Sequence, residues 1–471
     1  MEKWKKRIGY GAGDFACNLV FSIMASYLLF FYTDVFGITA TVAGTLMLVT
    51  KIIDAFADTG MGLLVDRTNT RWGQGRPYFL IGAIPFAAFT ILTFIVPDFS
   101  MGGKIVWAYV TYCLLNIAYT VVNITLNTIV PRLTSDDHER NWLVSTRMIC
   151  ALIGTALVMT ITNPLVNFFG KGDTQKGYLI TMTIYGVAAV IVFVFTFMNT
   201  KEVVPPTVER GKSTFKEDLK GLTGHALIFF ILNFLYFALF VIRNTTVIYY
   251  FTYNLGRTDW LTFVGLFGIL SGLPMLLLLP WLQRKLPKKN VLLLSTVIYI
   301  VGDLIIYFGK TSPVLLIAGL AITGLGIYGI FGTTFAIQPD IIDFSEYKNN
   351  KSITGMIAAF QGFAVKISLG LGSALVGVFL QLGGYVPNAT QTPKALSYIE
   401  VSFIWVPLAI CLLIGITMLF YKLDAKRSVM DTELNRRRNL LNDNVSKSLK
   451  SKEAEGRFLL GNFRETVEPS L

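Results

Sequence analysis

The sequence predicts an all-α integral membrane protein whose twelve transmembrane helices form two six-helix bundles. The chain of 471 residues is 53% hydrophobic and only 15% charged, whereas a soluble protein carries about 25% charged residues. Apolar runs of about 20 residues recur along it, each long enough to cross a bilayer as a helix and twice as long as a barrel strand requires. The basic residues fall mainly on alternate connections between these runs.

The apolar runs give the helices in order. The first residues, MEKWKKR, are basic, but no small-residue cleavage site follows them. The first run is therefore expected to remain as a helix and not to act as a cleaved signal peptide. The twelve expected ranges are 10–36, 40–65, 77–97, 104–131, 143–168, 177–199, 224–253, 260–281, 291–309, 313–338, 356–380 and 398–421.

The charge distribution predicts the orientation of the chain. Of the 41 Lys and Arg residues, 31 lie in the two tails and every second loop, six lie in the other loops and four lie within spans. Cytoplasmic loops carry this excess of basic residues, so both termini are expected in the cytoplasm, with the protein in the cell (plasma or inner) membrane. The net charge of +12 thus reports orientation, and a nucleic-acid partner is not expected.

The longest polar stretch between spans divides the chain into equal halves. We expect an N-terminal bundle at 1–199, a cytoplasmic middle loop at 200–223, a C-terminal bundle at 224–421 and a cytoplasmic tail at 422–471. Two six-helix halves are typical of the major facilitator architecture, in which substrate binds between the halves near mid-membrane. No strong internal repeat is visible, so this expectation rests on span count and loop position. We expect the protein to work as a monomer.

The sequence predicts no structural metal site, no cofactor and no enzyme activity. The cysteines fall within apolar runs without metal-like spacing, and buried free thiols are expected. The only two histidines are expected at helix–loop borders. The cysteines are Cys17, Cys113, Cys150 and Cys411, and the histidines are His138 and His225.

Charged residues inside the second span form a candidate ion site. In KIIDAFADTG, the residues Lys51, Asp54 and Asp58 are spaced i, i+3 and i+7 and share one helix face. Because intramembrane charges are costly, this face must point at the bundle interior or a water-filled cavity. A fixed structural ion pair is one reading. Uptake of a proton or cation by the surplus carboxylate is the other. Lys366, in the eleventh span, can approach both acids if the two halves face each other.

Two arginines within spans have more than one reading. Arg147 of the fifth span either donates hydrogen bonds to substrate or pins helices together by pairing with an acid. Arg243 of the seventh span has the same two readings and a third, because it lies nearer the outer end and its charged group could snorkel to the membrane interface.

Polar stripes in other spans predict a substrate site, although interhelical hydrogen bonding explains such stripes equally well. Asp14 and Asn18 share a face of the first span. Another face, in the fourth span, carries Asn116, Tyr119, Asn123 and Asn127. Gln361 lies five residues before Lys366. A sugar-sized ligand needs many donors and acceptors plus an aromatic face, which these groups supply.

The sequence resembles the melibiose-permease type of glycoside–pentoside–hexuronide:cation symporters, which belong to the major facilitator superfamily. The resemblance covers most of the chain. Its distinctive segments are LLFFYTDVFG, KIIDAFADTGMGLLVDRTNTRWGQGRPYFL, YTVVNITLNTIVP, ERNWLVSTR and DIIDFSEYKNNKSITG. It implies transport of a sugar or glycoside, coupled to a monovalent cation, across the lipid bilayer.

The resemblance also implies roles for single residues. The family's cation-binding acids match Asp54 and Asp58, its eleventh-span lysine matches Lys366, and its sugar-contacting arginine matches Arg147. An ungapped match puts Asn18 and Asn123 where the family's best-described member has sugar-contacting acids. Asn127 and Thr125 stand where that family has Trp and Pro. These departures argue against galactoside specificity.

We expect H⁺ as the coupling ion in preference to Na⁺. Sodium needs several hard oxygen ligands, whereas a proton needs one carboxylate, and position 18 lacks an acid. We expect the lysines, Lys51 and Lys366, to hold the site when it is empty. Two other classes remain open: a lipid or lysolipid carrier of the same fold, and a membrane sugar sensor that binds without transporting.

Charged loops predict a cytoplasmic latch between the bundles, although ordinary solvated turns would carry similar residues. Exposed ion pairs are weak singly, but a network can bias two states of similar energy. One loop carries Asp66, Arg67, Arg71 and Arg76, and the loop after the tenth span carries Asp340, Asp343, Glu346 and Lys348.

Overall fold

The computed structural model describes residues 2–68, 70–134, 136–203, 224–310, 312–349 and 354–424, together with six residues of the tail between 427 and 436. The predicted all-helical membrane fold is confirmed: the described residues form helices throughout, and the one β-bridge among them joins Thr70 to Gly73 in a turn. Within the described ranges, eleven helices are long and apolar enough to span a bilayer, and a shorter apolar helix at Pro77–Thr93 completes the twelve predicted segments.

The first half of the chain contributes six of these segments. The first runs through α1 into a short helix α2 and a π-helical turn η1. Gly37 caps this turn, and its φ of 89° lies in the left-handed region that glycine tolerates. The elements are α1 (Glu2–Ser26), α2 (Leu28–Phe30), η1 (Phe31–Phe36), α3 (Ala40–Arg67), α4 (Pro77–Thr93), α5 (Met101–Leu133), α6 (Asp137–Gly170) and α7 (Thr174–Asn199).

The second half repeats this count of six. Its first and last segments also contain π-helical turns, η2 and η4. The elements are α9 (Gly224–Tyr249), η2 (Tyr250–Asn254), η3 (Thr258–Trp260), α10 (Leu261–Lys285), α11 (Lys288–Phe308), α12 (Pro313–Asn349), α13 (Thr354–Gly383), α14 (Pro393–Glu400), η4 (Val401–Trp405) and α15 (Val406–Leu419).

Several helices extend beyond the predicted spans. The expected range 313–338 becomes Pro313–Asn349, and the range 143–168 becomes Asp137–Gly170. Hydropathy marks the part of a helix that matches the hydrocarbon layer, whereas backbone hydrogen bonding continues into the polar residues beyond it. In the opposite direction, the range 77–97 shortens to Pro77–Thr93.

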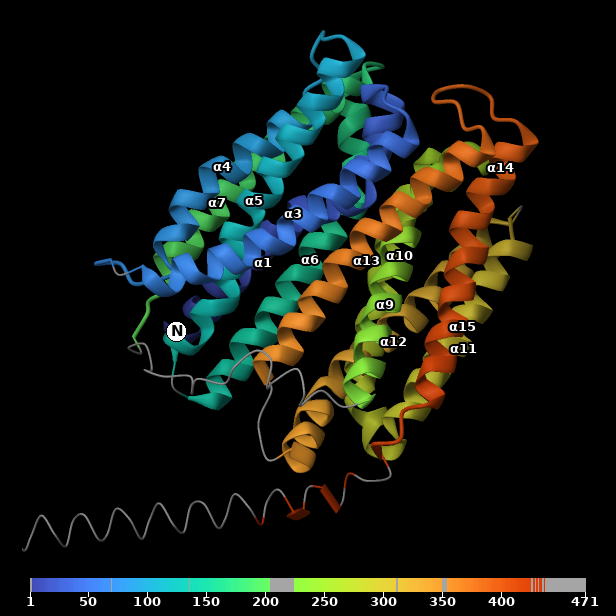
Figure 1. Cartoon of the computed structure of the whole chain (residues 1–471). Helices are drawn as coiled ribbons and strands as arrows, with labels where there is room; N and C mark the ends of the chain where they lie inside the picture. The colour runs from blue at the N-terminus through green and yellow to red at the C-terminus, as the bar shows by residue number, and fades with distance from the viewer. Residues whose placement is uncertain are drawn as a thin grey trace, which may run out of the picture.

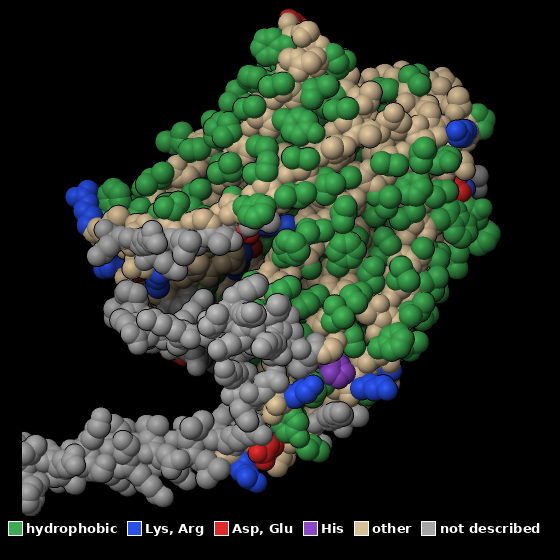
Figure 2. Space-filling model, in the orientation of Figure 1, with side chains coloured by type: hydrophobic (Ala, Val, Ile, Leu, Met, Phe, Trp, Pro, Cys, Tyr) green, Lys and Arg blue, Asp and Glu red, His purple; other side chains and the backbone are tan. Residues whose placement is uncertain are grey.

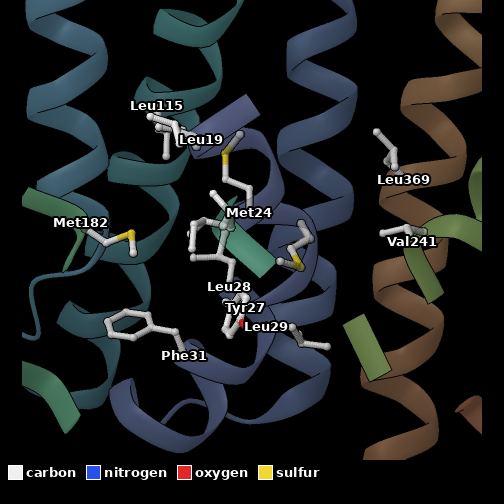
Figure 3. Close-up of a cluster of buried hydrophobic side chains, with 14 of the residues drawn as sticks. Leu19, Met24, Tyr27, Leu28, Leu29, Phe31, Leu115, Met182, Val241 and Leu369 are labelled. Atoms are coloured by element: carbon white, nitrogen blue, oxygen red, sulfur yellow. The ribbon is translucent and has the colours of Figure 1, made fainter. Parts of the chain in front are cut away.

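The two halves stand side by side, with α1–α7 on one side and α9–α15 on the other, and α3 and α13 meet along the boundary between them (Figure 1). One buried apolar cluster crosses this boundary. Leu19 and Met24 of α1 share it with Leu115 of α5, Val241 of α9 and Leu369 of α13 (Figure 3). The predicted domain limits remain a prediction, and residues 204–223 of the middle loop lie outside the described ranges.

The surface is largely apolar over the flanks of both halves (Figure 2). The four cysteines are free thiols. Cys17 and Cys411 are buried as predicted, whereas Cys113 and Cys150 are only partly buried, so the expectation of complete burial is wrong for these two.

Candidate functional site

The charged face of α3 packs against α5 inside the first bundle. Lys51 Nζ donates to Asn116 Oδ1 at 2.6 Å and lies 3.6 Å from Asp54 Oδ2. Thr120, one turn after Asn116, places its hydroxyl 2.6 Å from Asp54 Oδ1 and 3.1 Å from Asp58 Oδ1. One helix face thus presents two carboxylates, and the neighbouring helix presents a hydroxyl between them.

Lys366 of α13 bridges the same two carboxylates from the second bundle. Its Nζ lies 3.0 Å from Asp54 Oδ2 and 2.6 Å from Asp58 Oδ2. It also donates to the main-chain carbonyl of Asp54 at 2.8 Å. The predicted approach of Lys366 to Asp54 and Asp58 is therefore observed, and Lys366 forms ion pairs that connect the two bundles. We call Lys51, Asp54, Asp58 and Lys366 the ionic quartet.

The ionic quartet balances its own charge, with two ammonium groups and two carboxylates. The Asp54 and Lys51 residues are only 2% and 8% exposed, whereas the side chain of Asp58 is 31% exposed. Intramembrane charges of this kind persist when they are paired. The Lys366 ammonium occupies the position between the two carboxylates. A cation that binds to those oxygens must therefore displace this lysine or share the acids with it.

Arg147 of α6 lies at the centre of a second polar group in the first bundle. Its Nε is 3.1 Å from Asp14 Oδ2, and its Nη1 donates to Asn127 Oδ1 at 2.6 Å. Tyr10 Oη accepts a longer contact of 3.4 Å from the same Nη1. The fork of the guanidinium is therefore held between α1 and α5, and its charge is balanced by Asp14.

The predicted polar stripe of α5 continues this group. Asn123 Nδ2 donates to Tyr119 Oη at 3.0 Å, and the Tyr119 ring stacks on Phe21 with centroids 5.9 Å apart. Asn18 Oδ1 accepts from Thr155 Oγ1 of α6 at 3.4 Å. Five of the six predicted sugar residues thus lie on α1, α5 and α6 of one bundle.

Gln361 lies apart from them, because it faces α9 of its own bundle. Its Nε2 donates to Asn233 Oδ1 at 3.3 Å, and the residue is 9% exposed. The structure does not bring Gln361 into contact with Arg147 or the α5 stripe in this conformation.

Comparison with known proteins matches the sequence of this chain to a family. Residues 9–425 match the family described as MFS/sugar transport protein. The chain belongs to this family. The predicted resemblance to cation-coupled glycoside symporters is confirmed by two similar curated proteins. The isoprimeverose transporter of Lactiplantibacillus pentosus is 38% identical, covering 90% of each chain. The putative glycoside/cation symporter YagG of Escherichia coli K12 is 35% identical, covering 91% of this chain and 94% of its own.

A solved structure confirms the fold independently. The D-xylose-proton symporter has a TM-score of 0.65 over 89% of this chain and 97% of its own. Its sequence identity is 13%, so this likeness concerns the fold alone.

Two polar residues that contact the predicted site residues were not singled out from the sequence. Thr120 and Thr155 each join a predicted site residue across two helices. Asp14 had a signal in the sequence and was named there with Asn18, although its pairing with Arg147 was not predicted. The threonines had none, because threonines in apolar helices commonly bond to their own backbone, as Thr125 does to Val121 O.

Arg243 does not snorkel. Its Nη1 lies 2.9 Å from Asp303 Oδ1 of α11 and donates to the carbonyl of Phe403 at 2.7 Å. The guanidinium also lies over the Phe403 ring, 3.8 Å from its centroid. The snorkelling reading is wrong, because a fully buried aspartate in the neighbouring helix supplies a counter-charge.

Arg76 and Asp340, two of the predicted latch residues, pair with residues next to their own bundles in this conformation. Arg76 Nη2 donates to the carbonyl of Phe197 at 2.8 Å, and the Arg76 main-chain N–H donates to Glu202 Oε1 at 3.1 Å. On the other side, Asp340 pairs with Lys288 at 2.6 Å and with Arg427 of the tail.

Arg71 is exposed, with its guanidinium over the Trp72 ring, and Lys348 is exposed at the end of α12. Asp343 and Glu346 are half-buried on α12. The side chains of Asp66 and Arg67 lie outside the described residues.

The bundles are also joined at the end opposite the first residues of α1. Asp34 of η1 accepts hydrogen bonds from the hydroxyls of Tyr253 and Tyr385, and its main-chain carbonyl accepts from Asn388 Nδ2 at 2.6 Å. Next to it, Thr33 Oγ1 lies 2.8 Å from Tyr249 Oη. We call this group the distal closure. Toward the end that carries the N-terminus, Figure 2 shows a hollow between the bundles with charged side chains inside it.

Proposed function

We propose that this protein is a secondary active transporter that couples uptake of a sugar or glycoside to inward movement of a cation by alternating access. One observation carries the proposal: Lys366 of one bundle bridges Asp54 and Asp58 of the other. Lys366 connects the two bundles and also occupies the carboxylates that a cation would bind. Binding of a cation to Asp54 or Asp58 therefore affects how the bundles are held relative to each other. Such a link is the thermodynamic requirement for coupled transport.

The coupling follows from the charge of the ionic quartet. In the empty carrier the lysines neutralise the carboxylates, so the bundles can change between the two conformations without leaving a buried charge unpaired. A bound cation gives the quartet a net positive charge and weakens the hold of Lys366 on the acids. Looser contact between α3 and α13 then lets the proposed sugar-binding residues of the two bundles approach each other. One charge moving through 100 mV supplies about 2.3 kcal/mol, enough for roughly 50-fold accumulation.

We propose H⁺ rather than Na⁺ as the cation. Lys366 already takes up acceptor positions on both carboxylates, and among the described residues Thr120 supplies the one further side-chain oxygen in contact with them. Sodium in transporters is also coordinated by unwound main-chain carbonyls, and α3 is continuous through this region. A proton needs only one of the carboxylates.

The substrate is proposed to lie at Asn18, Tyr119, Asn123, Asn127 and Arg147, with Gln361 joining from the second bundle on closure. Names of similar proteins support a glycoside, since one is called an isoprimeverose transporter and another a putative glycoside/cation symporter. We place the protein in the cell membrane, with both termini cytoplasmic, acting as a monomer. In that orientation the distal closure is an outer gate and the conformation is inward-facing.

A transport assay tests this proposal. The purified chain in proteoliposomes is given a panel of labelled glycosides, pentosides and hexuronides that includes isoprimeverose, under separate pH and Na⁺ gradients. Uphill uptake of one sugar driven by the pH gradient is expected. Uptake driven by Na⁺ alone would overturn the choice of ion, and sugar binding without flux would favour the sensor. Absence of binding across the panel, with flip of a labelled lysolipid, would favour the lipid carrier.

A further inference from the structure

A buried carboxylate lies in the second bundle, apart from the ionic quartet and from the proposed sugar residues. Asp303 of α11 is 0% exposed. Among the described residues its one charged partner is Arg243 of α9, whose Nη1 lies 2.9 Å from Asp303 Oδ1. The function proposed above makes no use of this pair.

The carboxylate of Asp303 has little support from hydrogen bonds. Neither of its oxygens makes a hydrogen bond of ordinary geometry with a described residue. The hydroxyl of Tyr299, one turn earlier on α11, is close enough to act on this carboxylate, yet it is buried and likewise lacks such a bond. Buried polar groups are nearly always hydrogen-bonded. Burial disfavours the charged form of a carboxylic acid, and hydrogen bonds to that form are one of the means that offset this effect.

Arg243 is better supported than its partner. Its Nη1 donates to the carbonyl of Phe403 at 2.7 Å, and its guanidinium lies 3.8 Å from the centroid of the Phe403 ring. Arg243 also lines a cavity between the bundles and is 8% exposed. An arginine keeps its charge at any pH that a folded protein meets. Asp303 is therefore the member of the pair that can change its charge.

The other elements packed against this part of α11 add no second cation. On the α15 side the titratable group is Cys411, whose thiol donates to the carbonyl of Thr296 at 3.6 Å. On the α12 side the neighbour is Thr323, which is uncharged and lies against Gly302. Arg243 is thus the counter-charge on which ionised Asp303 depends.

The pair is connected to the distal closure. Phe403 belongs to the π-helical turn η4, and its ring stacks on Tyr250 of η2 with the centroids 4.4 Å apart. Tyr253, in the same turn η2, donates to Asp34 in the distal closure. A shift of Arg243 away from Phe403 would therefore disturb the turn that holds the outer ends of the bundles together.

We propose that Asp303 is a second proton-binding site of the carrier, and that a proton taken up there from the aqueous phase loosens the distal closure. The protonated carboxyl can donate to the Tyr299 hydroxyl, which gives both buried groups a partner. Arg243 then loses its counter-charge, and an unpaired buried charge is costly. The guanidinium moves into the adjoining cavity and releases Phe403. The inference goes beyond the proposed function, because it adds a proton site outside the ionic quartet.

Infrared difference spectroscopy tests the proton site without sugar. The purified chain in lipid nanodiscs is titrated from neutral to acid pH, and the C=O stretch of protonated carboxylic acids is recorded. The wild-type chain should gain a band that Asp303→Asn loses and that the control Asp58→Asn keeps. An unchanged band in Asp303→Asn would overturn the inference and leave the proposed function standing. Absence of sugar transport would overturn the proposed function and leave the band assignment standing.

A charge-neutral pair of substitutions tests the link to the distal closure. Arg243→Gln combined with Asp303→Asn leaves no charge unpaired, so it serves for both measurements if Asp303→Asn alone does not fold. Labelling from outside of a cysteine introduced below the distal closure should rise on acidification in the wild-type chain and lose most of that rise in the neutral pair. The control Lys310→Gln with Glu400→Gln removes another ion pair of the second bundle and should keep the rise. A full rise in the neutral pair would overturn the link and indicate that Asp34 itself titrates.

Discussion

Replacing Lys366 by glutamine should make the empty carrier bind its coupling cation more tightly. The substitution removes the ammonium that lies 3.0 Å from Asp54 and 2.6 Å from Asp58, and leaves two carboxylates with Lys51 alone. Removing one partner of a buried ion pair costs about 3–5 kcal/mol. We take the low end, because the side chain of Asp58 is 31% exposed and water screens part of its charge.

A cation entering the site of the Lys366→Gln variant would recover this energy. About 3 kcal/mol corresponds to roughly a hundredfold lower cation concentration at half-saturation. The assay is a conformational fluorescence signal, titrated with H⁺ and separately with Na⁺, in the absence of sugar. Uphill sugar uptake should nevertheless be lost, because cation binding to Asp54 and Asp58 no longer controls an ion pair between the bundles.

Two controls accompany this variant. Lys366→Arg keeps the charge and should retain most of the wild-type cation affinity. Lys394→Gln removes an exposed charge at the start of α14 and should change nothing. Unaltered cation affinity in Lys366→Gln would refute the competition between lysine and cation that the geometry predicts.

Three further variants test the substrate site and the two gates. Arg147→Lys loses the fork shared by Asp14 and Asn127, so equilibrium sugar binding should weaken by more than about 1 kcal/mol; normal affinity would mean that the sugar lies elsewhere. Asp34→Ala removes an acceptor from the distal closure and should raise the labelling of cysteines introduced below it from the outside, whereas unchanged labelling would show that this closure is not a gate. Arg76→Ala should change the ratio of outward to inward conformations in distance measurements while leaving sugar affinity per state nearly unchanged, and an unaltered ratio would remove the cytoplasmic latch.

The sequence was sufficient for the fold and for the ionic quartet. Spacing alone puts Lys51, Asp54 and Asp58 on one face of a helix, because helical periodicity is local. The cost of charge in a bilayer then requires that face to point inward. With two bundles facing each other, Lys366 is an obvious counter-charge.

Contacts between distant helices could not be predicted in this way. Helix rotation and register decide whether a polar side chain meets its own backbone or another helix, and neither is fixed by hydropathy. Thr120 and Thr155 were missed for this reason. The helix-pinning reading of Arg243 agrees with the structure, but its partner Asp303 could not be named because it lies 60 residues away in an apolar helix. The position of Gln361 depends on how far the bundles have closed, which a sequence does not state.

The central claim is that the carboxylates of the ionic quartet take up the coupling cation, and Asp58 is the more exposed of the two. Asp58→Asn removes the carboxylate that lies 2.6 Å from Lys366 and keeps its size. In proteoliposomes with a pH gradient and a membrane potential, this variant should fail to accumulate sugar, yet still exchange sugar across equal concentrations, and its sugar binding should lose most of its dependence on H⁺ or Na⁺. Accumulation against a gradient with unchanged ion dependence would contradict the claim and leave the ionic quartet as a fixed structural contact between the bundles.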